Sequence, residues 1–530
     1  MTEFTLIIGI IFGSLLTGFL CLFSSVRALS VLQQEGYSGK EYVRWYLRKD
    51  NMLPKRYSLL ALSLFLLTAL FSLCFSFLGY RSANLISALP YVGMFLLFLF
   101  AERKYALKVK FRATGRAVRL CVCHYLLLCI FSCGLCFALA AIAFAVDKSW
   151  LYQIRFVPMC ILPLISPFLL AVSNFVMKGV ELPRNRRFFR RAERALKESS
   201  CKKVGITGSC GKTSVKWISE QLLSQKFRVI ATPASFNTPL GIARTVNEKG
   251  LDCDIFLAEM GARKRGDVVE LCALVNPDYA VVTSVYPQHL KTFLSVDAIV
   301  EEKGVLARSV SAPILGKTAF DGGMNAPNAL VEGVDFGVKD VKLSAEGTQF
   351  CLMLPDGEIS VSTSLLGAHA AEDIALAAML CHQLGMTKEE IASAVEGVRQ
   401  IPHRLQRMDG NGLVILDDSY NANVAGVQNA LQVLRLFEGK KCVVTPGIVE
   451  LGILEEEENY KLGKSLVGLD LVLLVGETLA QPIKHGYLDG GGDAEKIVIV
   501  PTLQSAVAKM REQFQAGDCV LFLNDLPDRY

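Results

Sequence analysis

The chain has 530 residues, of which 52% are apolar, and a formal net charge of +6. This length allows about three to four domains of ordinary size. The net charge is modest and the basic residues lie between apolar runs, which indicates membrane topology and excludes a basic nucleic-acid-binding protein. Many of the 16 cysteines lie inside apolar runs. The soluble part has no CxxC pair at metal-site spacing, so we expect reduced thiols.

Apolar runs in the first 180 residues predict about five membrane-spanning helices, at residues 4–22, 57–79, 85–100, 120–146 and 156–177. A helix needs ~20 apolar residues to cross the hydrocarbon core, and the third run is the shortest. No basic residue precedes the first run and several more runs follow it, which argues against a cleaved signal peptide.

Basic residues orient these helices. The loops after the first, third and fifth runs are rich in lysine and arginine, whereas the intervening loops offer only Arg81, then Lys148 and Arg155. The N-terminus is therefore expected outside the cell membrane and everything after Lys178 in the cytoplasm. The spans are either a simple anchor or a domain that binds lipid or a partner. His124, expected at an interface, is almost their only ionisable residue, which argues against a proton pathway.

From Lys202 onward, short β-branched runs alternate with helical stretches, which is typical of an α/β fold with mostly parallel sheets. The Gly-rich residues 316–342 are expected to form loops, and a boundary near Ile401–Pro402 separates two α/β units. The predicted strands are residues 204–207, 255–258, 280–283, 414–416, 442–445, 471–475, 497–500 and 519–522.

A glycine-rich segment ending in Gly211-Lys212-Thr213 follows the first predicted strand and opens a predicted helix at residues 215–224. That context is typical of a phosphate loop, in which backbone N–H groups and the helix N-terminus surround the phosphates. Lys212 would reach the β- and γ-phosphates, and the Thr213 hydroxyl would bind Mg²⁺. The spacing departs from the strict Walker pattern, and the alternative is an ordinary Gly-rich turn. The expected nucleotide-binding loop comprises Thr207, Gly208, Ser209, Cys210, Gly211, Lys212, Thr213 and Ser214.

This loop resembles the ATP loop of the Mur ligases, which departs from the Walker spacing in the same way. Further segments follow in the family's order: Ser235-Phe-Asn237, Glu259-Met-Gly-Ala, Pro287-Gln-His289-Leu, Lys303, Gly367-Ala-His369, Pro402-His-Arg404-Leu-Gln and Asp417-Asp418-Ser-Tyr-Asn-Ala-Asn423. The last segment is similar to the MurF branch, which adds D-Ala-D-Ala to UDP-MurNAc-tripeptide. The resemblance covers roughly residues 203–451. It implies a central ATP-binding domain at residues 181–401 and a Rossmann-like C-terminal domain at 402–530, which follow the membrane domain that the apolar runs predict at residues 1–180.

The resemblance also implies roles for single residues. A carboxylate that attacks the γ-phosphate is an anion meeting an anion, so metal ions must neutralise both. The implied Mg²⁺ ligands are Thr213, Glu259, His289 and a carbamylated Lys303, and the implied catalytic residues are Lys212, Glu259, His289, Lys303 and Arg404. By residue type alone, Glu259 could be a surface acid, His289 a structural histidine and Lys303 an ordinary helix lysine.

Arg404 and Asp418, which both follow the boundary near residue 401, are expected to reach the nucleotide from the second α/β unit. Arg404 would contact the γ-phosphate, or else is a surface arginine at a hinge. Asp418 would contact the ribose, or else is a helix N-cap. Asp373 stands where the family has the asparagine that meets adenine, which puts that contact in doubt. The family's C-terminal Lys-Gly-Ser-Arg segment is not found, and the membrane spans stand where its UDP-MurNAc domain would be.

The expected function is ATP- and Mg²⁺-dependent amide ligation in peptidoglycan precursor synthesis, with an acyl phosphate intermediate. The expected partners are membrane lipids, a UDP-linked or lipid-linked precursor and an amine such as a D-amino-acid dipeptide, but no nucleic acid. One alternative is an amide ligase acting on another cell-envelope polymer. Another is a membrane transport or regulatory ATPase, although no Leu-Ser-Gly-Gly-Gln signature and no terminal tyrosine cluster is present.

Overall fold

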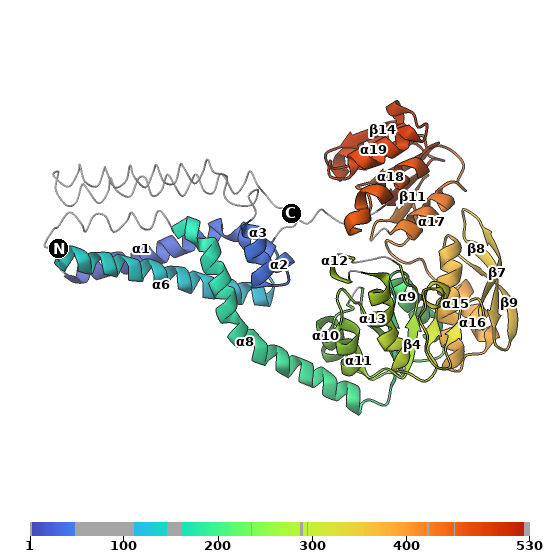
Figure 1. Ribbon diagram of the computed structural model, residues 1–530, viewed down its shortest axis with the longest axis horizontal. Coiled ribbons are helices and arrows are strands. Elements are labelled where there is room, and N and C mark those ends of the chain that lie inside the picture. The colour runs from blue at the N-terminus through green and yellow to red at the C-terminus, as the bar shows by residue number, and fades with distance from the viewer. Residues whose placement is uncertain are drawn as a thin grey trace. The chain divides into compact units, whose positions relative to one another are not determined.

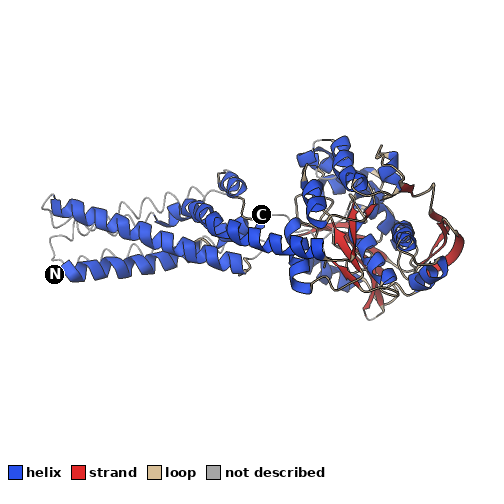
Figure 2. Ribbon diagram, turned by 90° about the horizontal axis from the view of Figure 1, so that it is seen from below, coloured by secondary structure: helices blue, strands red, loops and turns tan. Residues whose placement is uncertain are grey.

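The computed structural model in Figure 1 describes residues 3–47, 111–145, 162–234, 236–286, 290–293, 295–410, 412–420, 423–449 and 451–523. The chain divides into two compact units, and along the sequence the first boundary falls between Arg186 and Arg187. In its described residues the first unit is helical, and the second combines helices with sheets (Figure 2).

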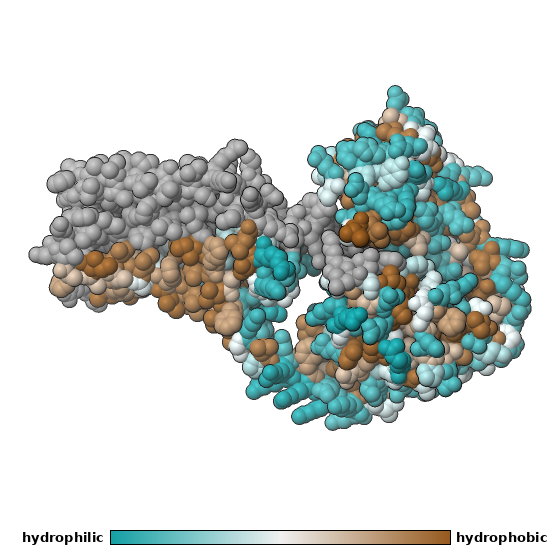
Figure 3. Space-filling model, viewed as in Figure 1, coloured by the Kyte–Doolittle hydropathy of each residue, from teal (hydrophilic) through white to brown (hydrophobic). Residues whose placement is uncertain are grey.

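The described part of the first unit contains the helices α1 (Glu3–Ser24), α2 (Val26–Gln34), α3 (Gly39–Tyr46), α6 (Gly115–Ala145) and the start of α8 (Leu162–Glu198). Large apolar side chains are exposed on these helices, with Phe12 at 69% and Phe144 at 78%. They give α1 and α6 the apolar surface visible in Figure 3. Water-soluble helices normally keep one polar face, so a helix that is apolar all round needs another covering.

Two helices of the described residues, Gly115–Ile142 and Ile165–Glu198, are long and apolar enough to cross a membrane. A third results if Ile10–Phe23 and Val26–Gln34, bent by 52°, form one span. These segments correspond to the first, fourth and fifth predicted runs. The second and third runs, at residues 57–79 and 85–100, lie outside the described residues.

The side chain of His124 is fully buried between helices. Its Nδ1 lies 3.1 Å from the Ser173 hydroxyl, and its Nε2 lies 3.1 Å from that of Ser166 and 3.3 Å from that of Ser25. The three hydroxyls supply the polar partners that a buried imidazole needs.

The second unit begins with a six-stranded sheet of order β2-β3-β1-β4-β5-β6, in which every paired strand is parallel. Side chains alternate between two buried clusters, one on each face of the sheet. The predicted strands at 204–207, 255–258 and 280–283 are confirmed. The strands are β1 (Lys202–Thr207), β2 (Val229–Ala231), β3 (Ile255–Glu259), β4 (Tyr279–Val282), β5 (Ile314–Leu315) and β6 (Leu330–Val331).

Helices cover both faces of this sheet. The face that contains Val204 and Ile206 packs against α9 and α15, and the opposite face packs against α10, α11 and α13. The helices are α9 (Lys212–Leu223), α10 (Pro239–Lys249), α11 (Asp267–Val275), α12 (Leu290–Phe293), α13 (Val296–Arg308), α14 (Lys317–Asp321), α15 (Ala368–Gln383) and α16 (Lys388–Glu396).

The expectation of loops throughout residues 316–342 is wrong. This stretch contains α14, β6 and most of β7 (Gly337–Leu343), which starts an antiparallel sheet with β8 (Thr348–Leu354) and β9 (Gly357–Thr363). Side chains of β7 alternate between the protein and solvent, and α15 covers its inner face. Half-exposed strands carry a weak sequence signal because packing partners decide their stability.

A second six-stranded sheet follows, of order β10-β11-β15-β12-β13-β14. Only the pair of β10 and β11 is antiparallel. The five predicted strands of this region are confirmed as β11 (Leu413–Asp418), β12 (Lys441–Thr445), β13 (Leu471–Val475), β14 (Ile497–Val500) and β15 (Cys519–Leu523), while β10 (Gln406–Gly410) is additional. The helices are α17 (Val424–Leu434), α18 (Glu455–Ser465), α19 (Ala480–Asp489) and α20 (Leu503–Gln513).

Candidate active site

The predicted phosphate loop connects β1 to α9 at the carboxyl edge of the first sheet. Gly211 is the N-cap residue of α9 and has a φ of 79°, which favours glycine. A Cβ atom on Gly211 would also lie 2.6 Å from Oδ1 of Asp373. The backbone conformation therefore favours glycine here, and any larger residue would also displace the Asp373 carboxyl group.

Residues after β4 hold the loop. The Ser209 amide donates to the Ser284 carbonyl at 2.7 Å, and the Ser209 hydroxyl donates to the Tyr286 carbonyl at 3.0 Å. The Cys210 amide donates to the Ser284 hydroxyl at 2.9 Å. Neighbouring protein groups thus hold the shape of the loop.

Lys212 folds back over this loop. Its Nζ donates to the carbonyl oxygens of Gly208 at 2.6 Å and Ser209 at 3.0 Å. Burial lowers the pKa of Lys212, and the carboxylate of Glu259 opposes that shift. Because a phosphate oxygen is a stronger acceptor for an ammonium than a carbonyl oxygen, an anion bound in the loop would draw Lys212 away from these carbonyls.

Glu259 ends β3 and is almost fully buried, so it is not a surface acid. Its Oε2 accepts hydrogen bonds from the Thr213 hydroxyl at 3.1 Å and the Lys216 ammonium at 2.9 Å, and its Oε1 accepts one from the Asn237 amide at 3.1 Å. Burial raises the pKa of Glu259, but Lys216, Lys212 and the Asn237 amide together outweigh burial, and the pKa lies below its usual value. The carboxylate is therefore ionised.

Sequence reasoning missed Lys216, although it lies one helical turn after Lys212 in α9. A lysine at that spacing faces the same side of the helix as Lys212. This spacing was the only available signal, and it does not distinguish an exposed lysine from one that reaches a carboxylate.

The donor chemistry fits magnesium. The Thr213 hydroxyl and the Glu259 carboxylate are adjacent hard oxygen ligands. Within the described residues, no group of three or more His, Cys, Asp or Glu side chains could hold a metal ion. Water and nucleotide phosphates commonly supply further oxygens to Mg²⁺ sites in nucleotide enzymes.

Lys303 lies in α13 with only 4% of its surface exposed, so it is not an ordinary surface lysine of a helix. Burial, and then the positive charge of Lys212, hold the pKa of Lys303 well below its usual value. The neighbouring Glu302 caps α11 by accepting from the amides of Gly266 and Val268. His289 lies outside the described residues.

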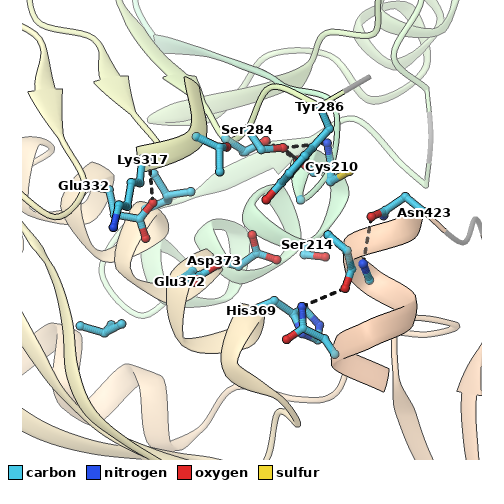
Figure 4. A pocket seen from close by; sticks show the side chains of 18 of the residues that line it. Cys210, Ser214, Ser284, Tyr286, Lys317, Glu332, His369, Glu372, Asp373 and Asn423 are labelled. Atoms are coloured by element: carbon cyan, nitrogen blue, oxygen red, sulfur yellow. Dashed lines mark hydrogen bonds between the residues drawn. The ribbon is translucent and has the colours of Figure 1, made fainter. Parts of the chain in front are cut away.

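A cavity of about 360 Å³ opens beside the phosphate loop. Cys210, Gly211 and Ser214 line it from the loop and α9, and Figure 4 shows Lys317 and Glu332 on one side and Asn423 on the other. Burial raises the pKa of the Glu332 carboxyl to about 7, despite a hydrogen bond from the Lys317 amide. Of the residues at this end of the cavity, Asp373 was predicted from the sequence, whereas Lys317, Glu332 and Glu372 were not.

Asp373 points into the same cavity from α15. Burial, and then the carboxyl groups of Glu372 and Glu332, hold the pKa of Asp373 well above its usual value, while Arg404 opposes the shift. A protonated aspartate has one O–H donor and one C=O acceptor. It therefore offers the same pair of hydrogen-bonding groups as an asparagine side chain.

We expect the substitution Asp373→Asn to reduce the pH dependence of stability. With a folded-state pKa above that of the unfolded chain, the folded protein keeps a proton that the unfolded chain loses. The free energy of unfolding of the wild type therefore falls as pH rises from about 4 through the folded-state pKa. Asparagine cannot ionise, so the variant should have the higher Tm near pH 8, with the difference shrinking towards about pH 5. A Tm difference that does not change with pH would contradict the assignment.

Arg404 and Asp418 line the cavity from the segment that leads into the second sheet and from its strand β11. His403 and Leu405, on either side of Arg404, have positive φ values of 59° and 46°. Such values are uncommon for these residue types and cluster at functional sites. The guanidinium of Arg404 lies 4.4 Å from the centre of the Tyr420 ring, so Arg404 is held at the cavity rather than free at a surface hinge.

Asp418 is not a helix N-cap, because Asn423 caps α17 by accepting from the Gly426 amide. Oδ1 of Asp418 instead accepts from the Leu405 amide at 3.1 Å. Burial raises the pKa of Asp418 to about 6, and Arg404 opposes that shift.

Comparisons with known proteins match both sheet-containing parts of the second unit. The Mur ligase middle domain matches residues 206–381, and the Mur ligase glutamate ligase domain matches residues 403–524. The chain belongs to the Mur ligase family. The first match contains Lys212, Glu259 and Lys303, and the second contains Arg404 and Asp418.

Named relatives point to one branch of this family. The UDP-N-acetylmuramoyl-tripeptide–D-alanyl-D-alanine ligase of Escherichia coli is 28% identical over 328 residues, which are 58% of this chain and 72% of that protein. The Bacillus subtilis enzyme of the same name is 28% identical over 353 residues, covering 62% and 74%.

Solved structures share the fold. MurF ligase from Thermotoga maritima, in complex with ADP, has a TM-score of 0.59 and 26% identity, covering 64% of this Mur ligase and 80% of that chain. MurF from Acinetobacter baumannii has a TM-score of 0.57 at 23% identity, covering 64% and 76%.

Proposed function

We propose that this Mur ligase joins a carboxylate to an amine in peptidoglycan precursor synthesis, using ATP. The observation that supports this most is the 360 Å³ cavity, because residues of both family domains line it. The phosphate loop lies at one wall, and Arg404 and Asp418 lie at another. A ligase that couples ATP cleavage to amide formation needs such convergent groups around one reacting phosphate.

The reaction has two steps. An oxygen of the carboxylate bonds to the γ-phosphorus while the bond to ADP breaks, which gives an acyl phosphate. The amine nitrogen then attacks the acyl carbon, loses a proton, and inorganic phosphate leaves. In the first step negative charge accumulates on the transferred group, so fixed positive charges contribute most of the protein's effect.

Individual residues fit parts of this chemistry. Lys212 would bind the β- and γ-phosphates, and Arg404 would approach the γ-phosphate. Thr213 and Glu259 would hold Mg²⁺, which supplies the charge neutralisation between the two anions. We further propose that Lys303, as a carbamate, and His289 complete the metal ligands. Asp418 would bind the ribose, and protonated Asp373 would bind the adenine.

The proposed substrates follow the relatives: UDP-MurNAc-tripeptide as carboxyl donor and D-Ala-D-Ala as amine. The purified full-length protein should release ADP only when ATP, Mg²⁺, donor and amine are all present. Parallel reactions with a lipid-linked donor would identify a membrane-held substrate instead. ADP release that needs neither donor nor amine would favour a transport or regulatory ATPase and contradict the ligase proposal.

We also propose that residues 1–180 form a multi-pass membrane domain, and that residues 181–401 and 402–530 are the two catalytic domains in the cytoplasm. The apolar surfaces of α1, α6 and α8 support a lipid covering, and the basic loops support this orientation. Reporter fusions after Lys148 and Tyr530 should report outside and cytoplasm, respectively. An external Tyr530 would contradict the proposal, because ATP is cytoplasmic.

A further inference from the structure

Lys216 forms a buried ion pair with Glu259. Their side chains are 2% and 1% exposed, and Nζ lies 2.9 Å from Oε2. Lys216 also donates to the Ala234 carbonyl at 2.5 Å, so the ammonium is held on two sides. The pair has no net charge, although it lies where a divalent cation is expected.

Lys216 and Thr213 share one oxygen of the Glu259 carboxylate. Oε2 of Glu259 accepts from both Lys216 and Thr213, and Oε1 accepts from Asn237. A metal ion that bound Thr213 and Glu259 would therefore lie beside a fixed ammonium. Repulsion between two cations is strong where water is excluded. Phosphate groups would offset that repulsion, because they add negative charge on the metal's open side.

We infer that Lys216 makes metal binding between Thr213 and Glu259 conditional on the nucleotide. Without phosphates the Lys216 ammonium excludes a free divalent cation, and with phosphates the cation enters together with the nucleotide. Lys216 is thus a positioning residue for Glu259 and also determines the order of binding. This inference rests on the proposed nucleotide function.

The test uses Mn²⁺ as the metal and the full-length protein, with free Mn²⁺ measured by electron paramagnetic resonance. The wild type should bind Mn²⁺ at this site only when ADP is added. Lys216→Met keeps the side-chain length but removes the charge. It should bind Mn²⁺ without ADP at least ~10-fold more tightly than the wild type, whereas its affinity for the Mn²⁺–ADP complex should change by less than that.

Two controls separate this effect from a loss of structure. Lys226→Met removes a lysine that pairs with Glu390 at 2.8 Å on the surface, and it should change neither affinity. The double substitution Lys216→Met/Glu259→Gln should lose the new Mn²⁺ site. If Lys216→Met does not fold, as judged by its melting curve, Lys216→Gln replaces it.

The inference is overturned if the wild type binds Mn²⁺ equally tightly with and without ADP, or if removing the lysine charge weakens both affinities. A failure of the proposed function would give a different result in the same experiment. In that case the wild type does not bind Mn²⁺–ADP at all, and the Lys216 substitutions do not change the affinity for the nucleotide.

Discussion

The substitution Lys212→Ala is expected to reduce ligation by at least ~10²-fold without unfolding the protein. Lys212 begins α9 and lies within hydrogen-bonding distance of the loop carbonyls of Gly208 and Ser209. Its ammonium can follow the charge that develops on the transferred phosphoryl group, and alanine leaves that charge unopposed. ADP release with donor and amine at saturation measures the effect.

The control for Lys212 is Lys226→Ala, which removes an ammonium that is paired on the surface. It should keep full activity, because it lies outside the residues that line the cavity. Melting curves should show that both variants are folded. A folded Lys212→Ala protein with near-normal ligation would mean that the loop does not bind the reacting phosphates.

The substitution Lys303→Ala is also expected to abolish ligation, and a short carboxylic acid such as acetate should restore part of it. The Lys303 side chain is buried and its pKa is held low by burial and by Lys212. A neutral amine is the form that reacts with CO₂, and the resulting carbamate is an anion that can bind Mg²⁺. An added carboxylate supplies the same charge in the space that alanine leaves.

Glu302→Ala is the matched control for Lys303, because the two residues are neighbours in α13 and both are buried. Glu302 accepts hydrogen bonds from the first turn of α11. Its loss should lower the Tm, and acetate should not reverse that change. Full activity of Lys303→Ala would exclude it from the site. Acetate rescue of both variants would show a general effect of the salt.

Local features of the sequence predicted a large part of the second unit. The strands β1, β3 and β4 are short, apolar and buried on both faces, so their composition identifies them. The phosphate loop was recognisable because its features lie within a few residues of one another. One of them is Gly211, whose positive φ favours glycine. Residues 316–342 were misread because β7 is half exposed and depends on α15 for its packing.

The sequence by itself determined the apolar character of the N-terminal helices, the alternation of strands and helices, and the phosphate loop, because each depends on residues close together in the chain. Only the tertiary structure decided which charges meet. Lys216 and Glu259 are 43 positions apart. Glu332, which follows β6, acts on the pKa of Asp373 in α15 although the two are distant in the sequence. Electrostatic interactions and burial depend on distances in space, and spacing along the chain does not report those distances.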